Sequence, residues 1–151
     1  MRTVKNILDS KPNAFNSIEP TAMVIDALRL LSTVNLSYLV VQQDNEFKGI
    51  FGERDYSRNV ILKGRSSDKT MVQEVMTTEL PIVGLDDTVE QCMNVMNAHK
   101  TRYLLAYNEG KFAGVITIHD LLRQVISGKE EVFDHNLAKK LIDNEESGRI
   151  Y

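Results

Sequence analysis

The stretch GVITIHDLL, residues 114–122, contains the pattern that decides the fold of this chain. A glycine opens a short apolar run, and Thr117 and Asp120 follow just before a pair of leucines. Residues 49–57 read GIFGERDYS, where the glycine and the aspartate keep their spacing but a second glycine replaces the threonine. The same order of a glycine, a predicted strand, a predicted turn and an aspartate therefore occurs twice in the chain.

The match extends over most of the chain when residue i is placed over residue i + 65, with no gap from about residue 18 to residue 61. Matching pairs include Val24 and Val89, Tyr38 and Tyr103, Phe47 and Phe112, and Arg58 and Arg123. The period exceeds the roughly 20–50 residues of solenoid repeats, so the pattern indicates a duplicated small domain. Because a half of this size is a marginal folding unit, we expect the two halves to share a core.

Each copy shows the same order of predicted elements, β-α-β-β-α. Apolar residues at helical spacing predict helices within residues 21–35 and 88–100, the second with Asp87 or Thr88 as its N-cap. Two apolar runs joined by a short polar turn predict a β-hairpin in each copy. The hairpins cover residues 37–51 and 102–116, short strands are predicted at 16–18 and 81–83, and a second helix is predicted to open at Asp55 and at Asp120.

We therefore expect an α+β fold of two β-α-β-β-α repeats followed by an amphipathic helix. The tail has Phe133, Leu137 and Leu141 at intervals of four, which indicates a helix whose apolar face packs on the domain or on a second subunit. The predicted boundaries are residues 3–62 for the first repeat, 63–70 for a polar linker, 71–127 for the second repeat and 128–151 for the tail.

Composition and charge narrow the class of protein. The chain has 151 residues, a formal charge of −3 and a pI of about 5.6, which argues against a nucleic-acid partner. No apolar run reaches the roughly 18 residues of a membrane span, and the N-terminus lacks the apolar stretch of a signal peptide. The expected location is cytoplasmic, with an organellar matrix as the alternative because a trimmed leader would leave no trace. The single cysteine, Cys92, lies among apolar residues and is expected in the core.

The repeated aspartate has two interpretations. At the junction of a strand and a helix, a carboxylate can cap the helix by accepting a hydrogen bond from a backbone N–H. It can also accept two hydrogen bonds from a vicinal diol such as ribose, while the helix N-terminus and the Thr117 hydroxyl offer donors to a phosphate. The glycine inside each preceding strand costs stability and indicates the close approach of another backbone segment. A diol on a carboxylate with a phosphate beside it describes a nucleotide.

These residues resemble a known family. The pattern G-x-x-T-x-x-D, formed by Gly114, Thr117 and Asp120, and the duplicated layout resemble a CBS domain pair, also called a Bateman module. The first copy reads GERDY at residues 52–56, which looks like the TERDY variant of small stand-alone bacterial and organellar pairs. The resemblance covers residues 3–127 and implies two repeats packed about a pseudo-twofold axis, with clefts that bind adenosine nucleotides. It also implies that two modules form a flat, disc-like homodimer.

Carried over residue by residue, the resemblance assigns Asp120 to the ribose and Thr117 to the phosphate. In the first copy Asp55 keeps the ribose position, whereas Gly52 stands where the family has threonine or serine. The phosphate contact is therefore expected to be weaker there, with the arginines of the same turn available to compensate. The predicted ligand-binding residues are Tyr38, Gly52, Arg54, Asp55 and Arg58 in the first copy, and Ile82, Val83, Arg102, Tyr103, Leu104, Gly114, Thr117, His119 and Asp120 in the second.

The sequence predicts a non-catalytic protein. It contains no P-loop string and no serine in a nucleophile elbow, and the two aspartates stand at equivalent positions that serve separate clefts. No histidine has metal-ligand spacing with another histidine or with the cysteine. We therefore expect a regulatory sensor of an adenosine nucleotide (AMP, ADP, ATP or NAD(H)) that uses no catalytic cofactor, forms a homodimer and signals to a separate effector protein. The alternative is a CBS pair without ligands that serves as a protein-interaction or dimerisation module.

Overall fold

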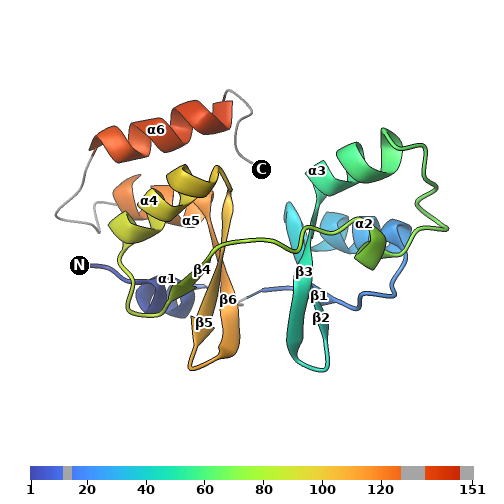
Figure 1. Cartoon of the computed structure of the whole chain (residues 1–151), viewed down its shortest axis with the longest axis horizontal. Helices are drawn as coiled ribbons and strands as arrows, with labels where there is room; N and C mark the ends of the chain where they lie inside the picture. The colour runs from blue at the N-terminus through green and yellow to red at the C-terminus, as the bar shows by residue number, and fades with distance from the viewer. Residues whose placement is uncertain (12–14, 127–134, 147–151) are drawn as a thin grey trace. The chain divides into compact units, whose positions relative to one another are not determined.

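The computed structural model describes residues 1–11, 15–126 and 135–146, and the chain forms two compact units (Figure 1). The Asp55 unit is Phe15–Glu79, and the Asp120 unit joins Met1–Ala14 to Leu80–Tyr151. We call residues 3–11 and 71–79 the leading segments of the first and second repeats. Each unit therefore contains most of one repeat together with the leading segment of the other.

Each unit is built on a three-stranded mixed sheet. The strands are β1 (Ser17–Ile18), β2 (Tyr38–Gln43) and β3 (Glu46–Gly52) in the Asp55 unit, and β4 (Ile82–Gly84), β5 (Tyr103–Asn108) and β6 (Lys111–Thr117) in the Asp120 unit. In both sheets the strands lie in sequence order, with the first pair parallel and the second antiparallel. The structure confirms the predicted hairpins, the short strands before them and the mixed α+β fold class.

Both hairpins turn in two residues. Asp44 and Asn45 have φ of 53° and 64°, and Glu109 and Gly110 have φ of 51° and 77°. Positive φ at both central residues is the signature of a type I′ turn, whose twist matches that of the flanking strands. Short polar residues and glycine adopt this conformation most readily, which explains why polar residues interrupt the apolar runs at these points.

The first helix of each repeat packs an apolar stripe on the sheet of its unit. These helices are α2 (Val24–Val34) and α4 (Val89–His99). The buried residues are Val24, Ala27 and Leu31 in α2, and Val89, Cys92, Met93 and Met96 in α4. The Thr88 hydroxyl accepts a hydrogen bond from the Gln91 amide (3.1 Å), so Thr88 and not Asp87 is the N-cap of α4.

The second helix of each repeat begins earlier than predicted. It comprises α3 (Glu53–Asp55) with the π-helix η1 (Tyr56–Ile61) in the Asp55 unit, and α5 (Ile118–Ile126) in the Asp120 unit. The prediction that each aspartate opens its helix is wrong, because Asp55 and Asp120 are the third residues of their helices. From this position each carboxylate accepts a hydrogen bond from the amide of the residue just before the helix.

A further helix, α1 (Val4–Ser10), is absent from the predicted order of elements and occupies the leading segment of the first repeat. Its N-terminus is closed by a reciprocal cap, in which the Thr3 amide donates to Asn6 Oδ1 (2.9 Å) and the Asn6 amide donates to Thr3 Oγ1 (3.4 Å). Val4 is fully buried in the Asp120 unit. The leading segment of the second repeat forms only a short 3₁₀ turn, η2 (Val72–Glu74), in the Asp55 unit.

Two hydrophobic clusters of buried residues lie in the described part of the chain, one in each unit. Each cluster contains residues of both repeats, because the repeats exchange their leading segments. Val4 and Ile7 join the cluster of the Asp120 unit, while Val72 and Val75 join that of the Asp55 unit. The core position of Cys92 is confirmed, and burial raises the pKa of its thiol to about 12.

The tail forms α6 (His135–Glu146), which packs on α4 within the Asp120 unit (Figure 1). Leu137 and Leu141 are buried in the cluster of this unit. The sequence left open whether this apolar face packs on the chain's own domain or on a second subunit. The structure shows that Leu137 and Leu141 pack on the chain's own domain, so they are not available for a subunit contact. Phe133 lies outside the described residues. None of the helices in the described ranges combines the length and the apolar character needed to cross a bilayer.

Candidate functional site

The predicted site residues of the Asp120 unit gather at one edge of its sheet, where β6 runs into α5. Tyr103 at the start of β5 pairs with Thr117 at the end of β6. The Ile118 amide donates to the Arg102 carbonyl (2.9 Å), which holds the first turn of α5 against the start of β5. Ile82 begins β4, which pairs in parallel with β5 close to the same edge. The fold therefore brings together residues that the sequence separates by up to about 40 positions.

Asp120 closes the start of α5 through a reciprocal cap. Its Oδ2 accepts a hydrogen bond from the Thr117 amide (2.8 Å), and its own amide donates to Thr117 Oγ1 (3.1 Å). The capping interpretation of this aspartate is therefore observed directly. Both side chains can still bind a ligand. The Asp120 carboxylate offers about four lone-pair positions, and the Thr117 hydroxyl accepts one hydrogen bond but still has its own proton to donate.

Of the two cations that the structure places beside Asp120, Lys11 is the closer, and this contact was not predicted from the sequence. Lys11 Nζ lies 2.6 Å from Asp120 Oδ2 and also donates to the Val115 carbonyl (2.8 Å). The side chains are 15% and 6% exposed, so the ion pair is almost removed from solvent. Arg123 Nη1 stands 3.7 Å from the other carboxylate oxygen. Because Lys11 belongs to the leading segment of the first repeat, only the exchange of segments brings it to this carboxylate.

Asp55 has the same backbone contact and a neutral partner in place of the lysine. Its Oδ2 accepts from the Gly52 amide (2.9 Å), and its Oδ1 accepts from the Thr77 hydroxyl (2.8 Å). Burial raises the pKa of Asp55 above its ordinary value, and the hydrogen bonds from Thr77 and Gly52 together with the charge of Arg58 only partly oppose this shift. The two carboxylates thus stand in equivalent places with different electrostatic surroundings.

The absence of a side chain at Gly49 allows the segment that contains Thr77 to approach β3 and Asp55. A two-way pairing joins β3 to the leading segment, since the Ile50 amide donates to the Thr77 carbonyl (2.8 Å) and the Thr77 amide donates to the Ile50 carbonyl (2.8 Å). A Cβ added at Gly49 would lie 2.8 Å from both the Met76 sulfur and the Thr77 carbonyl oxygen. For Gly49, the expectation that the glycine in the strand marks a close backbone approach is confirmed.

The other predicted residues differ in what they can offer to a ligand. Side chains of Tyr38, Val83 and Leu104 are buried, which leaves their main-chain groups as the available contacts. Ile82 is 62% exposed and His119 is also exposed, so both side chains can meet a ligand. Gly52, Arg54, Arg58, Arg102, Tyr103 and Gly114 are buried or half-buried beside the two strand-to-helix turns. Within the described ranges, no group of three or more histidine, cysteine, aspartate or glutamate residues is placed to hold a metal ion.

Comparison with known proteins leads to one family. The sequence profile of the CBS domain matches twice, at residues 4–61 and 72–127. The mitochondrial CBS domain-containing protein CBSX3 of Arabidopsis thaliana is 31% identical over 113 residues, a match that covers 72% of this chain and 55% of the plant protein. The chain thus spans about half the length of this relative.

Solved structures agree with the profile. A protein with CBS domains from Burkholderia ambifaria superposes with a TM-score of 0.77 at 33% identity, covering 88% of this chain and 100% of the other. CBSX2, crystallised in complex with AMP, superposes with a TM-score of 0.68 at 21% identity over 86% of this chain and 100% of the other, a likeness that shows the fold alone. Because the CBS profile matches both repeats and covers well over half of the residues, this chain belongs to the CBS-domain family as a tandem pair.

Proposed function

We propose that this CBS pair is a non-catalytic regulatory module that binds an adenosine nucleotide and conveys the bound state to a separate effector protein. The observation that supports this most directly is the pair of carboxylates, Asp55 and Asp120, at equivalent strand-to-helix turns. The AMP complex of CBSX2 adds support, because that protein has the same fold.

In the Asp120 unit, the ribose hydroxyls would donate to Asp120 at lone pairs that Thr117 and Lys11 leave open. The Thr117 hydroxyl accepts from the Asp120 amide and keeps its proton for a phosphate oxygen. The exposed side chain of Ile82 supplies apolar surface for the adenine ring, which main-chain groups near Tyr103 would recognise. Each of these roles uses a group that lies at the same edge of the sheet.

The Asp55 unit offers a weaker version of this site. Asp55 retains the carboxylate, but Gly52 has no hydroxyl to donate to a phosphate. A hydrogen bond to a charged group contributes roughly 1.5–3 kcal/mol, so its absence would weaken binding about 10- to 150-fold. Arg54 and Arg58 lie in the same turn and would recover part of this difference for ligands with more phosphates.

The alternative function is a protein-interaction module whose sites no longer take a ligand. The ion pair between Lys11 and Asp120 favours it, because the carboxylate proposed for the ribose is already neutralised and 6% exposed. The two functions differ in one measurable property, the response of thermal stability to adenosine compounds.

A thermal-shift screen with AMP, ADP, ATP, NAD, NADH and S-adenosylmethionine tests the proposal. A ligand at 100 times its dissociation constant should stabilise the fold by roughly 2.7 kcal/mol. We expect Asp120→Ala to remove the stronger response, whereas Asp55→Ala should leave it nearly unchanged. No response to any compound, in the wild-type chain and in both variants, would favour the interaction module.

Gly52→Thr gives a matched gain-of-function test of the weaker site. Gly52 has φ −135° and ψ 176°, a conformation that threonine adopts without strain. Calorimetry with AMP should show one strong and one weak site per chain, and the substitution should strengthen the weak one. Incubation with ATP and magnesium should return intact ATP, and release of ADP that depends on Asp120 would contradict a non-catalytic module.

A further inference from the structure

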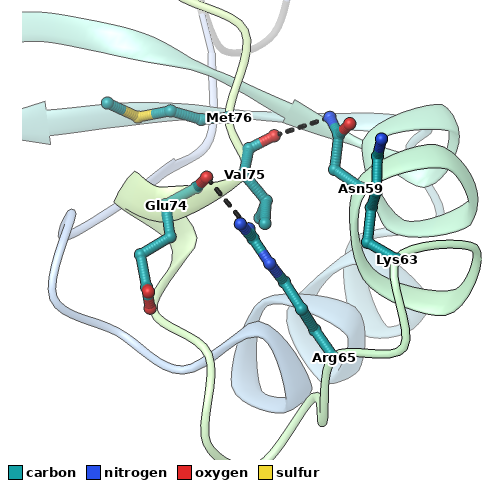
Figure 2. Close-up of a pocket in the computed structure, with 6 residues that line it drawn as sticks. All are labelled: Asn59, Lys63, Arg65, Glu74, Val75 and Met76. Atoms are coloured by element: carbon teal, nitrogen blue, oxygen red, sulfur yellow. Dashed lines mark hydrogen bonds between the residues drawn. The ribbon is translucent and has the colours of Figure 1, made fainter.

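The Asp55 unit contains a pocket that the nucleotide contacts proposed above do not use (Figure 2). Its volume is about 360 Å³, at the lower end of the roughly 300–1,000 Å³ range of small-molecule sites. One side of the pocket is formed by η1 and the loop that follows it, and the other side by the leading segment of the second repeat. The lining residues are Asn59, Lys63, Arg65, Glu74, Val75 and Met76.

Two cations line this pocket, and one of them is held in position. Arg65 Nη1 donates to the Glu74 main-chain carbonyl (3.2 Å), as Figure 2 shows. The guanidinium has five donor hydrogens, so this single hydrogen bond fixes its direction and leaves donors for a ligand. Among the residues that the structure describes, Lys63 makes no hydrogen bond or ion pair, so its ammonium group is available.

Two acceptors at the pocket, the Val75 carbonyl and one oxygen of the Glu74 carboxylate, already accept hydrogen bonds from the protein. Asn59 Nδ2 donates to the Val75 carbonyl (3.2 Å) across the pocket. The carboxylate of Glu74 accepts from the Met71 amide (2.7 Å), and Figure 2 shows it turned away from Lys63. The ammonium group of Lys63 and the remaining guanidinium donors of Arg65 are still free to bind a ligand.

We propose that this pocket binds a phosphate group of a small molecule, with Lys63 and Arg65 as its charged contacts. Arginine presents a planar fork that matches two phosphate oxygens, and lysine adds a mobile point charge. The hydrogen bond from Arg65 to the main chain lowers the entropy lost on binding, because the guanidinium is oriented beforehand.

The phosphate can belong to a nucleotide or to a free polyphosphate. Asn59 follows Asp55 by about one turn of the same helix, and Met76 directly precedes Thr77, which donates to Asp55. The pocket thus adjoins the proposed ribose contact of this unit. The version in which a nucleotide at Asp55 extends its phosphates into the pocket rests on the proposed function, whereas the binding of free pyrophosphate does not.

Titration with pyrophosphate, followed by the backbone amide NMR signals of Gly64 and Met76, tests the pocket directly. We expect saturable shifts, and Lys63→Met should weaken binding about fivefold, the loss of one exposed charge pair. Lys69→Met is the matched control, because Lys69 is an exposed lysine of the same loop that does not line the pocket. Shifts that do not saturate, or equal weakening by both substitutions, would overturn the proposal.

Parallel titrations with AMP and ATP identify the source of the phosphate. If a nucleotide extends into the pocket, Lys63→Met should weaken ATP binding about fivefold and leave AMP binding within twofold. If the pocket takes free polyphosphates, only the pyrophosphate affinity should fall. A chain that binds pyrophosphate through Lys63 and no adenosine compound would retain this inference while the proposed function fails.

Discussion

Lys11 and Asp120 form a nearly buried ion pair whose removal should be costly. Lys11→Met leaves the carboxylate without its closest cation, and we expect the free energy of unfolding to fall by about 1.5–3 kcal/mol in urea denaturation. Lys5→Met is the matched control in the same segment, because its ion pair with Asp9 is exposed and screened by solvent. Equal losses in the two variants would show that burial of the Lys11 pair adds nothing.

The same substitution separates the stability of the Asp120 site from its binding. If a ribose diol displaces Lys11 from Asp120, and does not use the lone pairs that Lys11 leaves open, Lys11→Met should strengthen adenosine binding in calorimetry even though it destabilises the fold. Adenosine is the suitable probe because it lacks a phosphate that could pair with the released ammonium. Weaker adenosine binding in Lys11→Met would contradict displacement of the lysine.

Asp55 should titrate above the ordinary pKa of an aspartate. The carboxyl ¹³C signal of Asp55 should have its midpoint above 3.8, because burial disfavours the charged form. Thr77→Val removes a hydroxyl donor that favours the ionised form, so the midpoint should rise further. Thr33→Val is a suitable control, since the Thr33 hydroxyl donates to the Arg29 carbonyl within its own helix.

The raised pKa of Asp55 determines whether the free energy of unfolding rises or falls with pH. Between 3.8 and the raised pKa, the folded chain binds more protons at Asp55 than the unfolded chain does. The contribution of Asp55 to stability therefore declines as pH rises through this interval and is lowest above it. Asp55→Asn should remove this slope from the stability profile, and an unchanged slope would mean that Asp55 is not the group responsible.

At the scale of elements, the pairing of β3 with the leading segment of the second repeat depends on a missing side chain. Gly49→Ala would place a methyl group 2.8 Å from the Thr77 carbonyl oxygen, which is backbone and cannot rotate away. We expect a loss of about 1–3 kcal/mol in thermal or urea unfolding, the usual cost of overpacking. Gly84→Ala is the control, because the nearest atom to its added Cβ lies 3.8 Å away. A neutral Gly49→Ala would show that this segment is free to shift.

Elements with regular patterns were predictable, whereas those completed by the other repeat were not. The apolar stripes of α2 and α4 follow helical spacing, and two-residue polar turns identify both hairpins. In contrast, α1 has seven residues, and its apolar positions are buried only because they join the unit of the second repeat. Its capping residues Thr3 and Asn6 were a usable signal, but a short helix cannot be inferred without its packing partner.

The candidate site shows the same division. The turn, its aspartate and the reason for Gly49 followed from local pattern and duplication. The contact of Lys11 with Asp120 and the contact of Thr77 with Asp55 depend on exchange, and nothing in the spacing of those residues indicates it. The start of each second helix was misplaced because an aspartate can accept an amide hydrogen bond from either the cap or the third position.

At the scale of the whole molecule, exposed apolar residues near the ends of the second helices support the predicted homodimer. Ile61 and Leu62 are 55% and 77% exposed, and Ile126, which matches Ile61 in the repeat, is 84% exposed. Exposed apolar side chains at these helix ends suit a contact with a second copy. This support replaces the apolar face of α6, which the chain itself buries.

Light scattering should give about twice the chain mass of 17.1 kDa at tens of micromolar. Combining Leu62→Glu with Ile126→Glu should return a monomer, because two charges would be buried without partners. Leu36→Glu, at a 38% exposed residue outside these helix ends, should leave the dimer intact. A monomeric wild-type chain would contradict the prediction.

The exchange of leading segments bears on how a chain of this kind arises. A single ancestral copy with the same pattern would take its leading segment from a second molecule, as each unit here takes one from the other repeat. Two such molecules would complete each other only after a collision, at a rate set by their concentration. Duplication and fusion of the gene make that partner part of the same polypeptide, so that assembly of both units no longer depends on how much protein the cell contains.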